Sequence, residues 1–258
     1  MSASIALAGV KKAFGPKVVL DGVDLAVAAG ESVVVIGGSG SGKSVLLKCV
    51  LGILAHDAGS IRIDGIDMDA ADAAERTRQR QRIGMLFQGG ALFDSLPVWR
   101  NITFALTRGK ARNTKAMHAR AVDLLAKVGL EPRVADLRPS ELSGGMQKRV
   151  ALARAIAAEP EIIFFDEPTT GLDPIRAAAI NSLIRGLVTD LGVTAVTITH
   201  DMASVRAIAD RVAMLKDGRI IWSGPVASLD SSGNDDVDRF VHGRAESQSV
   251  GTTPISSQ

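Results

Sequence analysis

Gly37-Gly38-Ser39-Gly40-Ser41-Gly42-Lys43-Ser44 is the stretch that decides the fold of this chain. It fits the pattern G-x-x-x-x-G-K-[ST] and lies between the apolar run 32–36 and a helical pattern that starts at Lys43. Glycines let successive backbone N–H groups turn inward around phosphates at a helix N-terminus. Lys43 can then reach the β and γ phosphates of a nucleotide, and the Ser44 hydroxyl can coordinate Mg²⁺. The stretch therefore predicts a phosphate-binding loop, and a chance Gly-rich turn is the less favoured alternative.

Apolar runs and helical patterns alternate along the rest of the chain. Short β-branched runs bounded by turn residues predict strands at 18–20, 32–36, 61–63, 83–87, 162–166 and 195–199. Helical patterns cover 43–51, about 115–128, 144–158, 174–191 and 202–209. Asp217-Gly218 between two apolar runs predicts a hairpin with a type I′ turn. Apolar strands that alternate with helices are typical of a mainly parallel sheet covered on both faces, so the sequence predicts an α/β fold.

The region from about 89 to 158 has a different character. It lacks strong strand signals, and its helical patterns are broken at Pro97, Pro132 and Pro139. We interpret it as a helical lobe inserted into a core of about 1–88 and 159–242, within one domain of 1–242. Residues 243–258 contain almost no large apolar side chains to offset the entropy cost of ordering, so they are predicted to form a flexible tail.

Composition limits the classes of partner. The 30 Lys and Arg residues nearly balance the 28 Asp and Glu residues, which gives a net charge of +2. The run RTRQRQR at 76–82 is interpreted as a solvated helix face, because no stacking aromatics accompany it, and no nucleic-acid partner is expected. No apolar run reaches the roughly 20 residues of a spanning helix, and the first residues do not resemble a secretory signal. We therefore expect a cytoplasmic location.

Two adjacent carboxylates, Asp166 and Glu167, end the apolar run 162–165. Ligands of parallel α/β sheets bind at the carboxyl ends of strands, and neighbouring strand residues point to opposite faces, so the two acids are expected to have different roles. Asp166 is the candidate Mg²⁺ partner, acting through water, and Glu167 is the candidate base that orients the attacking water. Such a pair alone would more often be a solvated strand end, but the phosphate-binding loop favours catalysis.

Ser143-Gly144-Gly145-Met146-Gln147 opens a helix and forms a second Gly-rich helix N-terminus. A serine hydroxyl and free backbone N–H groups at such a position can bind an anion, although a simple helix cap is the usual explanation. One subunit has no obvious use for two phosphate cradles unless each meets the γ-phosphate bound by another copy. The motif therefore predicts a dimer that shares its ATP molecules.

The order of these motifs resembles the ABC ATPase family. The resemblance depends on the phosphate-binding loop, Gln88, LSGGMQ at 142–147, FFDEP at 164–168, GLDP at 171–174 and His200. It extends from about Ile5 to Phe240 and implies a P-loop NTPase (RecA-like) core, an N-terminal antiparallel β part and an inserted α-helical lobe. It also implies ATP hydrolysis with Mg²⁺ by a pair of identical subunits, coupled to an integral-membrane permease on a separate chain.

The resemblance further implies roles for single residues. Gln88 would contact Mg²⁺ and sense the γ-phosphate, and Asp173 would lie at the dimer contact. His200 would bond the γ-phosphate and support Glu167. The family usually stacks adenine on an aromatic ring ahead of the second strand. This chain has no tyrosine, and Phe14 is the only aromatic residue of that stretch, so it is the candidate adenine platform, with a purely structural packing role as the alternative.

Residues 85–99, MLFQGGALFDSLPVW, and SELSGGM at 140–146 resemble the ATPase subunits of Mla-type phospholipid transport systems. The family places the segment after Gln88 in a groove that receives a short helix of the permease. This resemblance implies intermembrane phospholipid transport at the inner face of the inner membrane, with an Mce-domain lipid-binding protein in the complex. The alternatives are an importer of amino acids or another small solute, and a non-transport ABC ATPase.

Overall fold

The computed structural model describes residues 3–107 and 113–244, and the predicted tail lies outside the described residues from position 245 onward. Its strands, in chain order, are β1 (Ile5–Phe14), β2 (Lys17–Val27), β3 (Ser32–Ile36), β4 (Ala58–Ile63), β5 (Ile66–Asp67), β6 (Ile83–Leu86), β7 (Ile162–Asp166), β8 (Thr194–Ile198), β9 (Arg211–Lys216) and β10 (Arg219–Pro225). Its α-helices are α1 (Lys43–Val50), α2 (Ala73–Gln81), α3 (Val98–Thr107), α4 (Thr114–Lys127), α5 (Gly144–Ile156), α6 (Pro174–Leu191), α7 (Met202–Ile208) and α8 (Asp235–Val241). Short 3₁₀ turns cover Pro132–Asp136, Pro139–Glu141 and Val226–Ser231.

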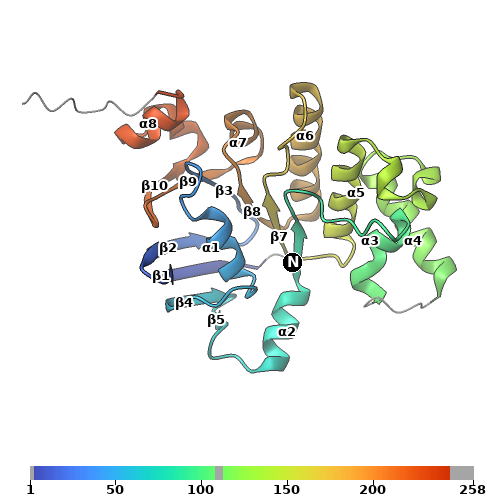
Figure 1. The fold of residues 1–258 in the computed structure, drawn as a ribbon, viewed down its shortest axis with the longest axis horizontal. Coiled ribbons are helices and arrows are strands. Elements are labelled where there is room, and N and C mark those ends of the chain that lie inside the picture. Colours follow the sequence, from blue (N-terminus) through green and yellow to red (C-terminus); the bar gives the residue numbers. More distant parts are fainter. Residues whose placement is uncertain (1–2, 108–112, 245–258) are drawn as a thin grey trace, which may run out of the picture.

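Two sheets form the core (Figure 1). The larger has the order β10-β9-β3-β8-β7-β6, and all its neighbouring strands are parallel except the β9–β10 hairpin. The smaller sheet, β2-β1-β4-β5, is antiparallel. In the hairpin turn, Asp217 and Gly218 both have positive φ, 48° and 73°, as a type I′ turn requires. The predicted mainly parallel α/β core with an N-terminal antiparallel part is confirmed.

The central strand β3 is buried on both faces, which explains its unbroken apolar sequence. Val33 and Val35 pack with α1 and the small sheet, whereas Val34 and Ile36 face the opposite way, toward the cluster that includes α5, α6 and α7. The alternation follows from the two-residue period of a strand. Both layers therefore meet at the strand that leads directly into the phosphate-binding loop.

Helices α3, α4 and α5 pack on one another at one end of the molecule (Figure 1). Ile102, Leu124 and Leu125 are fully or almost fully buried between them. The structure thus has the helices that the interrupted region predicted, although its limits at 89 and 158 stay a prediction. Within residues 3–107 and 113–244, no helix is long and apolar enough to cross a membrane.

Candidate functional site

The P-loop, residues 37–44, connects β3 to α1 as the sequence predicts. Its Lys43 Nζ donates to the carbonyl oxygens of Gly37 and Gly38 at 2.7 and 2.9 Å and lies 3.4 Å from the Ser41 hydroxyl. Gly37 has φ 155°, and a Cβ there would meet the Leu215 carbonyl at 2.3 Å. The loop therefore closes around the lysine in a path that tolerates no side chain at its first residue.

The charged lysine of the P-loop interacts electrostatically with the acids at the end of β7. Burial lowers the pKa of Lys43, while the negative charges of Glu167 and Asp166 oppose that shift. Ser44 follows Lys43 in the first turn of α1 and is exposed. The loop thus offers a desolvated cation and an accessible hydroxyl at a helix N-terminus, the arrangement that receives phosphates.

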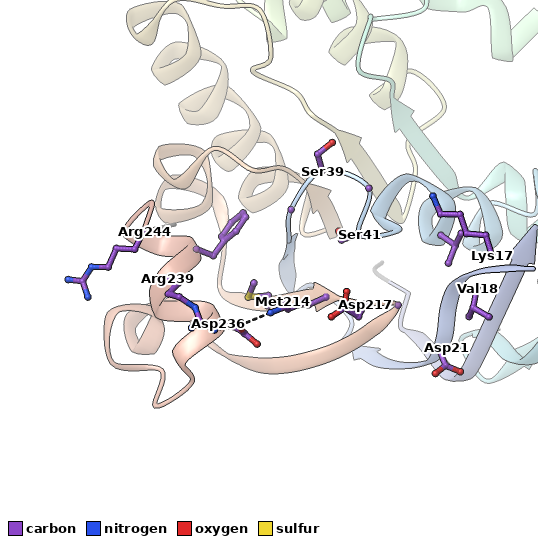
Figure 2. A pocket seen from close by; sticks show the side chains of 16 residues that line it. Lys17, Val18, Asp21, Ser39, Ser41, Met214, Asp217, Asp236, Arg239 and Arg244 are labelled. Atoms are coloured by element: carbon purple, nitrogen blue, oxygen red, sulfur yellow. Dashed lines mark hydrogen bonds and ion pairs between the residues drawn. The ribbon is translucent and has the colours of Figure 1, made fainter. Parts of the chain in front are cut away.

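A cavity of about 630 Å³ borders the P-loop (Figure 2). Its lining comes from residues 38–41, the start of β2 at Lys17, the turn at Asp217 and helix α8. The ion pair between Lys216 and Asp236, 2.7 Å long, fastens α8 to β9 at this place. The cavity is open enough for part of a nucleotide beyond its phosphates.

Phe14 is the last residue of β1, just before the turn that leads into β2 and Lys17. Its side chain is 48% exposed, and Lys12 Nζ lies 5.6 Å from the centre of its ring. Phe14 itself does not line the cavity. An exposed ring in this hairpin is free to stack on a flat ligand, and its role as the adenine platform stays a prediction.

Glu167 lies directly after β7 and is held in place from three sides. One carboxylate oxygen is 2.8 Å from His200 Nδ1, and the other accepts bonds from the hydroxyls of Thr170 and Thr199 at 3.0 and 3.3 Å. The residue has φ 47°, in the left-handed region that side chains other than glycine rarely adopt. Its side chain is 12% exposed, whereas that of His200 is 65% exposed. The carboxylate is therefore fixed, and the histidine beside it remains accessible.

Asp166 differs from its neighbour. Its Oδ1 is buried and has no hydrogen-bond partner within the described residues. Burial raises the pKa of Asp166, and the charge of Glu167 adds to this effect. A buried, unsatisfied carboxylate oxygen beside a phosphate-binding loop fits the hard oxygen coordination that Mg²⁺ prefers.

Ser143 caps helix α5, where its hydroxyl accepts a bond from the Met146 N–H at 3.4 Å. Ser143 and Gly144 are exposed, while the Gln147 amide donates to the Pro139 carbonyl at 2.9 Å. No hydrogen bond or ion pair in the described part of the chain joins 143–147 to the P-loop, and Figure 1 shows α1 and α5 well apart. The two Gly-rich motifs of one chain do not form a common site.

Gln88 and Asp173 occupy surface positions. The Gln88 side chain is exposed just after β6, and its backbone carbonyl accepts a bond from Lys148 Nζ. Asp173 caps helix α6 by accepting from the Arg176 N–H at 3.0 Å and pairs with the Arg176 guanidinium at 3.2 Å.

Sequence reasoning missed three side chains that contact this region. Thr170 and Thr199 hold the Glu167 carboxylate, and Lys148 contacts the Glu167 carbonyl at 3.4 Å. Thr170 lies three residues after Glu167, within reach of a turn, which is a local signal. Thr199 and Lys148 carry no comparable signal, because their distance from Glu167 depends on the tertiary fold.

The sequence of this chain is similar to those of known proteins. The profile of the ABC transporter family matches residues 20–170. The chain is 39% identical over 232 residues to the intermembrane phospholipid transport system ATP-binding protein MlaF of Escherichia coli (strain K12), covering 90% of this chain and 86% of MlaF. It is 40% identical over 240 residues to the methionine import ATP-binding protein MetN of Rhizobium etli, covering 93% of this chain and 66% of MetN.

The chain is also similar to a solved structure. The dimeric post-hydrolysis state of the ATP-binding cassette MJ0796, bound to ADP and phosphate, superimposes with a TM-score of 0.77 at 34% identity, covering 86% of this chain and 98% of that one. The likeness therefore includes both sequence and fold over most of the chain. This protein belongs to the ABC transporter family and is an ATP-binding subunit that hydrolyses ATP.

Proposed function

We propose that this chain is the motor of a membrane transporter: two copies enclose two ATP molecules at the inner face of the inner membrane and drive a permease on a separate chain, with phospholipids as cargo. The observation that carries the catalytic part is the fixed Glu167 carboxylate, 2.8 Å from His200 at the end of β7. The similarity to MlaF over 90% of the chain supports the cargo.

In the hydrolysis step, Glu167 accepts a hydrogen bond from the attacking water and orients it toward the γ-phosphate. Thr170 and Thr199 occupy one carboxylate oxygen, which leaves the oxygen beside His200 for the water. The exposed His200 ring can contact the γ-phosphate, and Lys43 neutralises the charge that develops on the phosphates.

A Mg²⁺ ion would be held by Ser44, Gln88 and, through water, Asp166. When bound, it would neutralise charge on the β and γ phosphates and orient them for attack. The unsatisfied Oδ1 of Asp166 and the exposed side chains of Ser44 and Gln88 support this set. Only one of the three residues is a carboxylate, as is common for Mg²⁺ sites in which waters and phosphates complete the coordination.

The dimer follows from the separation of the two Gly-rich motifs. Ser143 and Gly144 expose a helix N-terminus that has no phosphate ligand of its own, because the P-loop of the same chain lies elsewhere. In a head-to-tail pair, 143–147 of one copy would face the ATP on the P-loop of the other. The dimeric structure of MJ0796, which shares this fold, supports such a pair.

The permease contact is proposed for the segment after Gln88. Phe93 in this segment is 43% exposed, which leaves apolar surface for a partner, whereas Val98 is fully buried and belongs to the lobe's own core. The Phe93 ring lies against that of Phe104, with a centroid distance of 4.6 Å and a tilt of 38°, and this contact keeps it in place. Phe93 is therefore the residue of this segment that we propose to contact the permease.

Phe14 offers a separate test of nucleotide binding. Replacing Phe14 by alanine is expected to weaken ATP binding by about 5- to 150-fold, because stacking of a base on an aromatic ring contributes ~1–3 kcal/mol. Affinity for inorganic tripolyphosphate, which has no base, should stay unchanged, and Phe14→Trp should bind ATP as the native chain does. Calorimetry measures all three, and unchanged ATP affinity of the alanine variant would assign Phe14 a packing role only.

The cargo is tested by purifying the tagged chain from detergent-solubilised native membranes and identifying co-purified proteins and lipids by mass spectrometry. Recovery of a permease with an Mce-domain lipid-binding protein and phospholipid supports the proposal. A permease with an amino-acid-binding protein would overturn the proposal that phospholipids are the cargo. It would favour amino-acid import, since MetN is named as a methionine import protein. Absence of any membrane protein would overturn the transporter assignment and favour a non-transport ABC ATPase. A Phe93→Asp variant, expected to lose the permease but keep ATP turnover, controls for nonspecific capture.

A further inference from the structure

Lys148 is a buried lysine in the second turn of α5, the helix that starts at Ser143. It is 7% exposed, and within the described residues no carboxylate forms an ion pair with its ammonium group, although the charges of Asp166 and Glu167 act on it from a greater distance. Burying an ammonium group without a carboxylate partner costs free energy unless hydrogen bonds compensate it. The position of Lys148 therefore calls for an explanation beyond packing.

The hydrogen bonds of Lys148 lead to the hydrolytic site. Its Nζ donates to the backbone carbonyl of Gln88 and, at 3.4 Å, to that of Glu167. These two residues follow different strands, β6 and β7, and their side chains have the proposed roles of γ-phosphate sensor and base. One ammonium group, with three donors, thus bonds the backbone of both residues and fixes the points from which their side chains emerge.

A second cation of the same helix strengthens the connection. Arg154 donates to the carbonyls of Gly90 and Ala91, each at 2.6 Å, one turn and a half beyond Lys148. The loop that follows β6 is therefore bonded along α5 through three carbonyl oxygens, from Gln88 to Ala91. A displacement of α5 must carry this loop with it, because charged hydrogen bonds of this kind are strong.

We propose that Lys148 is a positioning residue that couples the two nucleotide sites of the dimer. The N-terminus of α5 faces the partner's ATP, while Lys148, one turn further along the helix, holds Gln88 and Glu167 beside the chain's own ATP. Engagement of one site thereby sets the geometry of the other. This inference rests on the proposed dimer and on the proposed roles of Gln88 and Glu167.

The test compares Lys148→Met with Arg149→Met in the purified full-length chain. Methionine keeps an unbranched, apolar stem and removes the ammonium group. Arg149 is the matched control: it is the next residue of α5 and donates to the Val128 carbonyl at 2.9 Å, inside the helical lobe and away from the site. Lys148→Met loses two cation–carbonyl contacts of α5 and Arg149→Met loses one, but only Lys148→Met loses contact with Gln88 and Glu167.

Lys148→Met is expected to lower kcat for ATP about tenfold, leave KM for ATP within about twofold, and reduce the Hill coefficient toward one. Arg149→Met should keep kcat and the Hill coefficient, and Lys148→Arg, which restores a cation, should recover most of the lost turnover. Thermal unfolding of each variant identifies any loss that comes from destabilisation alone.

Native kcat and cooperativity in Lys148→Met would overturn the proposal, and so would an equal loss of both in Arg149→Met. A Lys148→Arg variant as slow as Lys148→Met would also contradict it, because the cation would then not be the active feature. The proposed function is tested separately by the unmodified chain. If that chain hydrolyses ATP without cooperativity, the shared-ATP dimer fails; if it is cooperative and Lys148→Met is equally so, only the role of Lys148 fails.

Discussion

Replacing Glu167 by glutamine is expected to lower the ATP turnover number by about 10²- to 10⁴-fold, the usual contribution of a general base. Glutamine has the same length and can still bond the hydroxyls of Thr170 and Thr199, but it lacks the negative charge that attracts a proton from water. ATP binding should persist, so the variant should accumulate as an ATP-bound dimer. Phosphate release measures the turnover, and light scattering with ATP measures the dimer.

Glu159→Gln is the matched control for this experiment. The Glu159 side chain is 79% exposed and pairs with the Arg120 guanidinium at 2.6 Å, so loss of its charge should leave turnover unchanged. Native turnover in Glu167→Gln would remove this residue from the role of base. A monomeric Glu167→Gln protein that still binds ATP would contradict the shared-ATP dimer.

Replacing Lys43 by methionine is expected to lower ATP turnover by at least ~10²-fold and to weaken ATP binding, because the variant loses the cation that faces the β and γ phosphates. Methionine keeps much of the stem length without the charge. Burial already lowers the pKa of Lys43, which means that the folded protein holds this charge at a cost. The free energy of unfolding without nucleotide should therefore change little, because the loss of the bonds to the Gly37 and Gly38 carbonyls offsets the relieved burial of the charge.

Calorimetric titration with ATP and denaturant unfolding of the free protein check the two parts of this prediction. Lys127→Met, in the exposed last turn of α4, removes a lysine of equal size far from the P-loop and should retain ATP binding. Full ATP affinity in Lys43→Met would contradict the assignment of this lysine to the phosphates. Unfolding of the variant in the absence of ATP would show that the lysine stabilises the loop itself.

Much of the fold could be predicted because its signals are local. The buried strands β3 and β7 are continuous apolar runs, and the P-loop and the Asp217 turn depend on glycines at fixed positions. Strand β1 was not predicted. Its pairing with β2 shifts register between Leu7 and Val10 and again after Val10 and after Lys12. Its sequence therefore lacks the regular alternation by which a strand is recognised.

The candidate site could also be predicted from the sequence only in part. Sequence alone named the residues that belong to contiguous motifs, such as the P-loop and the acids after β7. It could not name Lys148, because a lysine in the middle of a helix normally indicates a solvated face. Only the packing of α5 against the ends of β6 and β7 brings its ammonium group to Gln88 and Glu167. Contacts between distant segments have no signature in one sequence.

The left-handed backbone of Glu167 places conformational strain on the residue that is proposed as the base. A non-glycine residue at φ 47° costs about 1 kcal/mol relative to glycine, which adopts this conformation freely. In the folded protein this strain is offset by the hydrogen bonds that the Glu167 carboxylate makes with Thr170, Thr199 and His200, each of which contributes about 1 kcal/mol. Glu167→Gly would relax the backbone but remove these bonds together with the candidate base, so a thermostabilised descendant of this protein must gain its stability at other positions.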